Sequence, residues 1–129
     1  MSTKEVGNFG ERIAEKYLRD KGYQILDKNY SFRLPGNPQK SEIDIIAKKS
    51  DIVSFVEVKA LSDGGRALII SPEEKVNFGK QRKLVKAAES WLMKNKITLN
   101  SKWQIDVISV RIAQGKAKIW HFENAVSYA

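Results

Sequence analysis

Two short apolar segments that carry acidic side chains constrain the fold of this chain more than any other feature. Residues 42–48 and 52–60 are rich in Ile, Val and Phe and surround a short turn, which predicts two neighbouring antiparallel strands. Side chains alternate between the two faces of a strand, so Glu57 and Lys59 share one face. If Asp44 faces the same side, two carboxylates and one ammonium group come together within otherwise apolar strands.

Charged groups in such a setting are costly to bury unless they pair with each other or bind a metal ion. Mg²⁺ binds through one or two carboxylates, and waters and substrate phosphates complete its coordination shell. Asp44, Glu57 and Lys59 therefore favour metal-assisted hydrolysis of a phosphodiester, in which the lysine orients a water or stabilises developing charge. A structural ion cluster at a sheet edge explains the same residues, and the pattern alone leaves both interpretations open.

The rest of the chain predicts a single α/β domain over residues 1–129. Apolar periodicity and turn residues predict further helices at residues 5–21 and 72–94, strands at residues 23–30, 102–112 and 116–122, and loops at residues 33–41 and 61–72. Gly22 is expected to end the first helix. The element order α-β-β-β-α-β-β indicates a central mixed β-sheet flanked by helices.

Composition excludes several chemistries. The chain has no Cys and one His, which excludes a thiol nucleophile, a disulfide framework and a structural zinc site of Cys and His ligands. His121 is therefore expected to be structural. No apolar run reaches the length of a membrane span, and no signal peptide is visible, so we expect a cytoplasmic protein without a membrane partner.

The net charge of +8 favours a polyanionic partner, because neutralising phosphates releases counterions. Basic side chains gather near the start of the second predicted helix, at Lys80, Arg82, Lys83 and Lys86. These residues are candidate contacts to the phosphates of a nucleic acid, and an ordinary solvated helix face is the alternative. The three tryptophans, Trp91, Trp103 and Trp120, are expected in the core rather than as platforms for stacked bases.

Asp44 followed by Glu57-Val58-Lys59 resembles the PD-(D/E)XK motif of nucleases with a restriction-endonuclease-like fold. More closely, the chain resembles the YraN-like family of predicted bacterial endonucleases, and it is similar to archaeal Holliday-junction resolvases. The matching segments run almost from end to end: Gly10-Glu11 with Ala14 and Tyr17-Leu18, residues 22–26 with Asn29, and residues 42–47, 55–59, 80–83, 106–108 and 121–126.

The resemblance implies a metal-dependent endonuclease, a phosphodiester hydrolase, that acts on nucleic acid with Mg²⁺ or Mn²⁺. It implies that Asp44, Glu57 and the backbone carbonyl of Val58 bind the metal ion and that Lys59 is the catalytic lysine. Glu11 corresponds to a first-helix glutamate that some resolvase-like members place at the metal site. Gln81 corresponds to the glutamine that follows the catalytic lysine in RecB-like members.

The expected substrate is DNA, and the resolvase-like relatives suggest branched or repair intermediates and a homodimer by analogy alone. The sequence departs from the family pattern at Ser41, where a glycine is usual, at Ile43, which replaces the proline of the motif, and at Val85, where RecB-like members have tyrosine. Glu42 is open to interpretation as a ligand or a bystander. The alternative function is a non-catalytic nucleic-acid-binding module in a repair or recombination assembly.

Overall fold

A computed structural model of the protein describes residues 2–33, 35–36, 40–62 and 78–126. Its elements are α1 (Thr3–Asp20), β1 (Gln24–Arg33), β2 (Lys40–Lys49), β3 (Ile52–Ser62), α2 (Phe78–Lys94), β4 (Trp103–Ala113) and β5 (Lys116–Phe122). This order confirms the predicted α/β class and is consistent with a restriction-endonuclease-like fold. The predicted start of the second helix and most of the loop before it, residues 63–77, lie outside the described residues.

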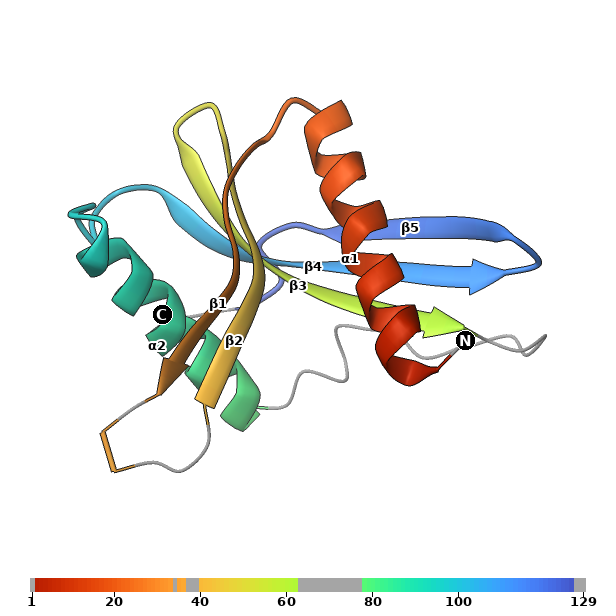
Figure 1. The fold of residues 1–129 in the computed structure, drawn as a ribbon. Coiled ribbons are helices and arrows are strands. Elements are labelled where there is room, and N and C mark those ends of the chain that lie inside the picture. The colour runs from red at the N-terminus through yellow and green to blue at the C-terminus, as the bar shows by residue number, and fades with distance from the viewer. Residues whose placement is uncertain (1, 34, 37–39, 63–77, 127–129) are drawn as a thin grey trace.

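The strands form one mixed sheet in the order β1-β2-β3-β4-β5. Neighbouring strands are antiparallel except β3 and β4, which are parallel and are connected through α2. Figure 1 shows α1 lying across the half of the sheet that contains β3, β4 and β5, while α2 packs on the other face beside β1 and β2. The two helices therefore enclose the sheet between them.

Each face of the sheet has its own apolar core. The core under α2 includes Ile46, Phe55, Trp91, Leu92, Trp103 and Ile105, and the core under α1 includes Ala14, Leu18, Ile45, Val56 and Ile108. The ring of Phe55 meets that of Trp91 edge-on, with centroids 5.7 Å apart. The prediction that Trp91 and Trp103 lie in the core is thus confirmed. The same expectation is wrong for Trp120, which is 42% exposed on the edge strand β5.

Capping residues determine where α1 begins and where it ends. The side chain of Ser2 accepts a hydrogen bond from the Glu5 N–H, and the Glu5 side chain bonds back to the Ser2 N–H. At the other end, Gly22 adopts a φ of +94°, and its N–H donates to the Arg19 carbonyl. The prediction that Gly22 ends this helix is confirmed.

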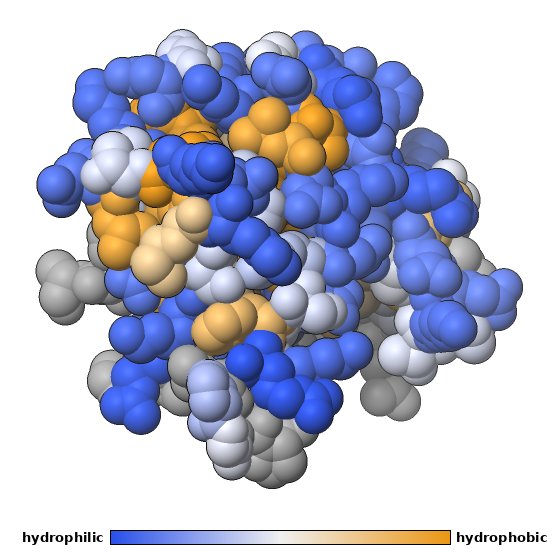
Figure 2. Space-filling view, turned by 60° about the vertical axis from the view of Figure 1, so that its left-hand side comes forward, coloured by the Kyte–Doolittle hydropathy of each residue, from blue (hydrophilic) through white to orange (hydrophobic). Residues whose placement is uncertain are grey.

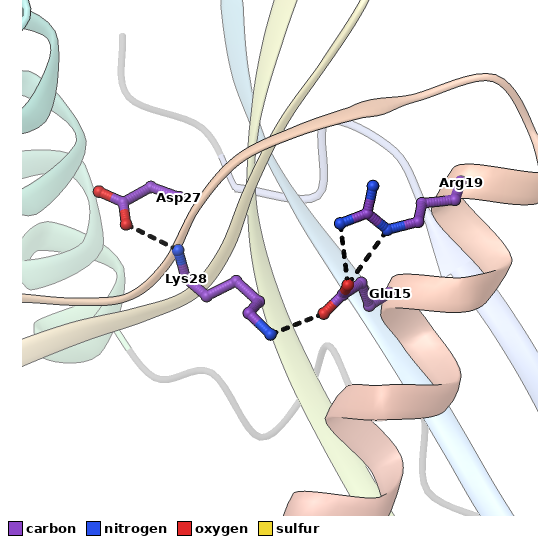
Figure 3. A network of polar contacts seen from close by, with 4 residues as sticks. All are labelled: Glu15, Arg19, Asp27 and Lys28. Carbon is purple, nitrogen blue, oxygen red and sulfur yellow. Dashed lines mark hydrogen bonds and ion pairs between the residues drawn. The ribbon is translucent and has the colours of Figure 1, made fainter.

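Polar contacts tie β1 to both helices (Figure 3). Glu15 of α1 pairs with Arg19 of the same helix and with Lys28 of β1, whose Nζ lies 2.9 Å from a Glu15 oxygen. Asp27 accepts a hydrogen bond from the Lys28 N–H and another, at 3.0 Å, from the Trp91 indole on α2. The surface ion pairs add little stability, whereas the bond to the buried indole fixes how α2 sits on β1.

The surface that carries α2 and β1 is largely hydrophilic, with apolar side chains gathered in separate patches (Figure 2). Neither helix in the described part of the chain has the length and apolar content needed to cross a membrane.

Candidate active site at the split between β2 and β3

The acidic residues stand where β2 and β3 separate. The ladder between these strands runs from Lys49 opposite Ile52 to Ile45 opposite Val56, although both strands continue further. The unpaired first residues of β2 lie toward the start of α2, whereas the unpaired last residues of β3 lie toward the N-terminal half of α1 (Figure 1). Continuing the same register would place Asp44 opposite Glu57. The split therefore opens at these two carboxylates.

A side-chain hydrogen bond occupies the split. The Val58 N–H donates to Oδ2 of the half-buried Asp44 at 2.7 Å. This charge-assisted bond orients the carboxylate and leaves its second oxygen to bind another group. The β1–β2 pairing keeps one register on both sides of Asp44, with Lys28 opposite Ile45 and Tyr30 opposite Ile43, and its irregularity lies between Ile25 and Asp27.

Glu57 and Lys59 lie on one face of β3, as predicted. The Lys59 Nζ stands 3.4 Å from Oε1 of Glu57, and the two side chains are 24% and 9% exposed. Alternation along β3 places them on the same side as Phe55, which belongs to the core under α2. The lysine therefore holds a positive charge next to a nearly buried carboxylate.

Four carboxylates act electrostatically on one another at the split. Burial raises the pKa of Asp44 to about 7, and the charges of Glu57, Glu11 and Glu42 add to this effect. Burial also raises the pKa of Glu11, and Glu42 and Glu57 contribute, whereas Lys28 opposes the shift. We call Glu11, Glu42, Asp44 and Glu57, together with Lys59, the carboxylate site.

Close helix packing brings Glu11 to this site. A Cβ atom added at Gly10 would collide with the Cβ of Ala60, so α1 and β3 approach each other as closely as a glycine allows. Glu11 is half-buried at this contact, whereas the carboxylate of Glu42 comes from a solvent-exposed residue. Glu11 thus lies near enough to Glu42 and Glu57 for their charges to act on it, and its role at a metal site stays a prediction.

The remaining predicted site residues lie on α2. Gln81 and Lys83 are half-buried, and Arg82 and Lys86 are exposed. Lys86 pairs with Glu89, with a separation of 3.6 Å between Nζ and Oε1. The side chain of Lys80 lies outside the described residues. The assigned roles of these α2 residues stay predictions.

A second group of candidate ligands was not expected from the sequence. One atom each of Asp106, His121 and Glu123 lies within 4.8 Å of the others, and we call these residues the histidine site. Among the described residues, no set of three that includes Asp44 meets this distance. The predicted β4–β5 hairpin implies that two of these residues are close, because a turn at residues 114–115 places Asp106 opposite Glu123.

Comparison with known proteins assigns most of the chain to one family. The model described as "Uncharacterised protein family UPF0102" matches residues 10–110, a span that holds every member of the carboxylate site. The chain belongs to the UPF0102 family. It is 42% identical to a UPF0102 protein of Alkaliphilus oremlandii over 124 residues, which cover 95% of this chain and 97% of the relative.

Two further UPF0102 relatives align over nearly the full chain. A protein of Clostridioides difficile is 39% identical across 97% of this chain and 99% of its own length. A protein of Fervidobacterium nodosum is 45% identical across 94% of this chain and 81% of its own length. These matches support the resemblance to the YraN-like family.

Proposed function

We propose that this UPF0102 protein is a Mg²⁺- or Mn²⁺-dependent phosphodiesterase that acts on DNA as an endonuclease. The observation that carries the proposal is the carboxylate site itself. The charge of Glu57 acts on Asp44 where two strands separate, Lys59 pairs with Glu57, and Glu11 and Glu42 add negative charge. Such crowding of carboxylates destabilises the fold unless the site binds something positive.

The donor atoms suit a hard divalent cation. Asp44 and Glu57 offer the one or two carboxylates that Mg²⁺ usually takes from a protein, and the Val58 carbonyl and Glu11 are further oxygen donors. The bond from the Val58 N–H already fixes the orientation of Asp44. When bound, a divalent cation supplies Lewis acidity, which lowers the pKa of a coordinated water and polarises a phosphate.

The chain's own residues supply the rest of the chemistry. The Lys59 ammonium can donate hydrogen bonds to the attacking water or to a phosphate oxygen, and it stabilises negative charge that develops in the transition state. Oε1 of Glu57, which lies 3.4 Å from the Lys59 Nζ, orients the lysine. A structural ion cluster would need no such excess of carboxylates over ammonium groups.

The charge of the protein matches a nucleic-acid substrate. The net charge is +8, and Arg82 and Lys86 are exposed on α2, whose start lies near the split. Contacts of this kind hold the phosphate backbone without reading sequence, which fits a protein that recognises shape. The choice of DNA, of branched or repair intermediates and of a homodimer extends the family resemblance.

Cleavage assays with matched variants test this function. Wild type, Asp44→Asn, Lys59→Met and the control Asp51→Asn, at an exposed position of the same hairpin, would be incubated with end-labelled duplex, single-stranded, forked and four-way DNA and with RNA. We expect cleavage by wild type and control in Mg²⁺ or Mn²⁺, none in EDTA, and none by the other two variants. Cleavage by Asp44→Asn at the wild-type rate would exclude the proposed site.

The same experiment distinguishes the alternative function. If wild type binds DNA with a steep dependence on salt but hydrolyses no substrate under any metal condition, the protein is a binding module. Light scattering of the protein with and without a four-way junction would test the homodimer in the same preparation.

A further inference from the structure

The histidine site lies on β4 and β5, on the face of the sheet that α1 covers. Asp106 pairs with Val56 in the β3–β4 ladder, and His121 pairs with Ile108 in the β4–β5 ladder. Val56 and Ile108 belong to the core under α1. Glu57 and Lys59 lie on the opposite face with Phe55, so the sheet separates them from the histidine site. We propose that Asp106, His121 and Glu123 form a second metal site, for a transition-metal cation such as Zn²⁺ that accepts an imidazole nitrogen.

The ligand atoms are already nearly in place. Nε2 of His121 lies 2.8 Å from Oδ2 of Asp106, and an oxygen of Glu123 completes the group within 4.8 Å. Two ligand atoms at tetrahedral positions around Zn²⁺ stand about 3.3 Å apart, because each bond is about 2.0 Å long. Replacing the shared proton with the cation therefore requires the Asp106–His121 pair to open by only about half an ångström.

Hydrogen bonds from outside the group orient two of the ligands. Gln104 Nε2, at 3.0 Å, and the Asn124 N–H, at 2.9 Å, both donate to Oδ1 of Asp106, so Oδ2 is the oxygen turned toward His121. The Tyr17 hydroxyl lies 3.1 Å from Nδ1 of His121. With the cation on Nε2, the imidazole proton resides on Nδ1 and is donated to the Tyr17 oxygen, the arrangement that metal-binding histidines usually have.

The surroundings of the group favour a cation at its centre. Two carboxylates share this group with a single imidazole, and Asp106 is fully buried, so a bound cation would offset negative charge that water screens poorly.

A cleft gives the cation access to solvent and an open coordination position. Its lining includes His121, Glu123, Tyr17 and Tyr23, with Lys21 and Lys49 near the two tyrosine rings at 5.9 and 5.3 Å. Glu123 is exposed, so a cation can enter from this side. Three protein ligands with a free fourth position are typical of zinc sites that bind a further group, and the lysines favour an anionic one.

The test uses the fact that the chain contains one histidine. ¹⁵N-labelled protein, with any purification tag removed, would be titrated with ZnCl₂ and separately with MgCl₂. The Asp44→Asn variant serves as background, so that the carboxylate site and its proposed activity do not affect the result. We expect Zn²⁺, and not Mg²⁺, to shift the Nε2 resonance of His121 to the metal-bound range at one equivalent, with Nδ1 protonated.

Calorimetric titrations with Zn²⁺ identify the other ligands. We expect Glu123→Gln to weaken the affinity more than tenfold and Tyr17→Phe to weaken it about tenfold, while the exposed Asp20→Asn leaves it unchanged. Glu123→Gln and Tyr17→Phe keep nearly the size of the original side chains, so we expect both variants to fold. A His121 spectrum that Zn²⁺ does not alter, or equal affinities for Glu123→Gln and Asp20→Asn, would overturn the proposal and leave a structural hydrogen bond.

Discussion

Replacing Asp44 with asparagine removes a charge that opposes folding. The folded protein raises the pKa of this carboxyl from 3.8 to about 7, chiefly through burial and then through Glu57. Between these two pH values the folded state holds a proton that the unfolded state has lost, so stability falls as pH rises through this window. The full penalty, about 4 kcal/mol, applies above pH 7.

Asparagine keeps an oxygen that accepts the bond from the Val58 N–H, so the variant loses the charge but keeps the contact. We therefore expect Asp44→Asn to exceed wild type in free energy of unfolding by about 2–4 kcal/mol at pH 8. The difference should shrink toward zero as pH falls below about 4.

Urea unfolding followed by circular dichroism, in EDTA at pH 8 and at pH 3.5, measures the difference in free energy of unfolding at both ends of this pH window. The control is Asp51→Asn, because the pKa of Asp51 is lowered by its bond to Lys102 and this variant should gain no stability at pH 8. Saturating Mg²⁺ should stabilise wild type, by about 2.7 kcal/mol at a hundred times the dissociation constant, and should leave Asp44→Asn unchanged. A variant less stable than wild type at pH 8, or a difference independent of pH, would refute the reasoning.

Three further predictions concern other parts of the structure. Gly10→Ala should destabilise the protein by about 1–3 kcal/mol because its Cβ would collide with Ala60, whereas Gly7→Ala, which meets nothing within 4 Å, should be neutral or stabilising in the same thermal melts. Lys59→Met should lower the single-turnover cleavage rate at least a hundredfold with little change in DNA affinity, and equal losses of both would contradict a transition-state role. Arg82→Gln should reduce the slope of log affinity against log salt by about 1, and an unchanged slope would place the phosphates elsewhere.

Local patterns predicted most of the fold. The apolar arc that contains Ala14 and Leu18 predicted α1, and runs of β-branched and aromatic residues predicted the strands. Burial on one face of an element produces a periodic pattern of apolar residues, which can be recognised in the sequence. Strand alternation also gave the shared face of Glu57 and Lys59, and the short turn between the strands paired β2 with β3. These relations involve near neighbours in the chain, which is why the sequence was sufficient.

Other features of the two sites depend on contacts between distant segments. The end of the β2–β3 ladder and the bond from Val58 to Asp44 follow from how the strands diverge, which local periodicity does not specify. The exposure of Trp120 depends on β5 being an edge strand, which the residues of β5 do not reveal. The approach of His121 to Asp106 depends on the β4–β5 register, which the residues around His121 do not specify by themselves.

The rate of DNA cleavage by wild type and by Asp44→Asn, with excess protein and end-labelled four-way junction and duplex in Mn²⁺, tests the central claim most directly. The account predicts a measurable wild-type rate that EDTA abolishes and a loss of at least a hundredfold in the variant, although the variant is the more stable protein at pH 8. Equal rates for the two proteins would contradict a phosphodiesterase built on Asp44.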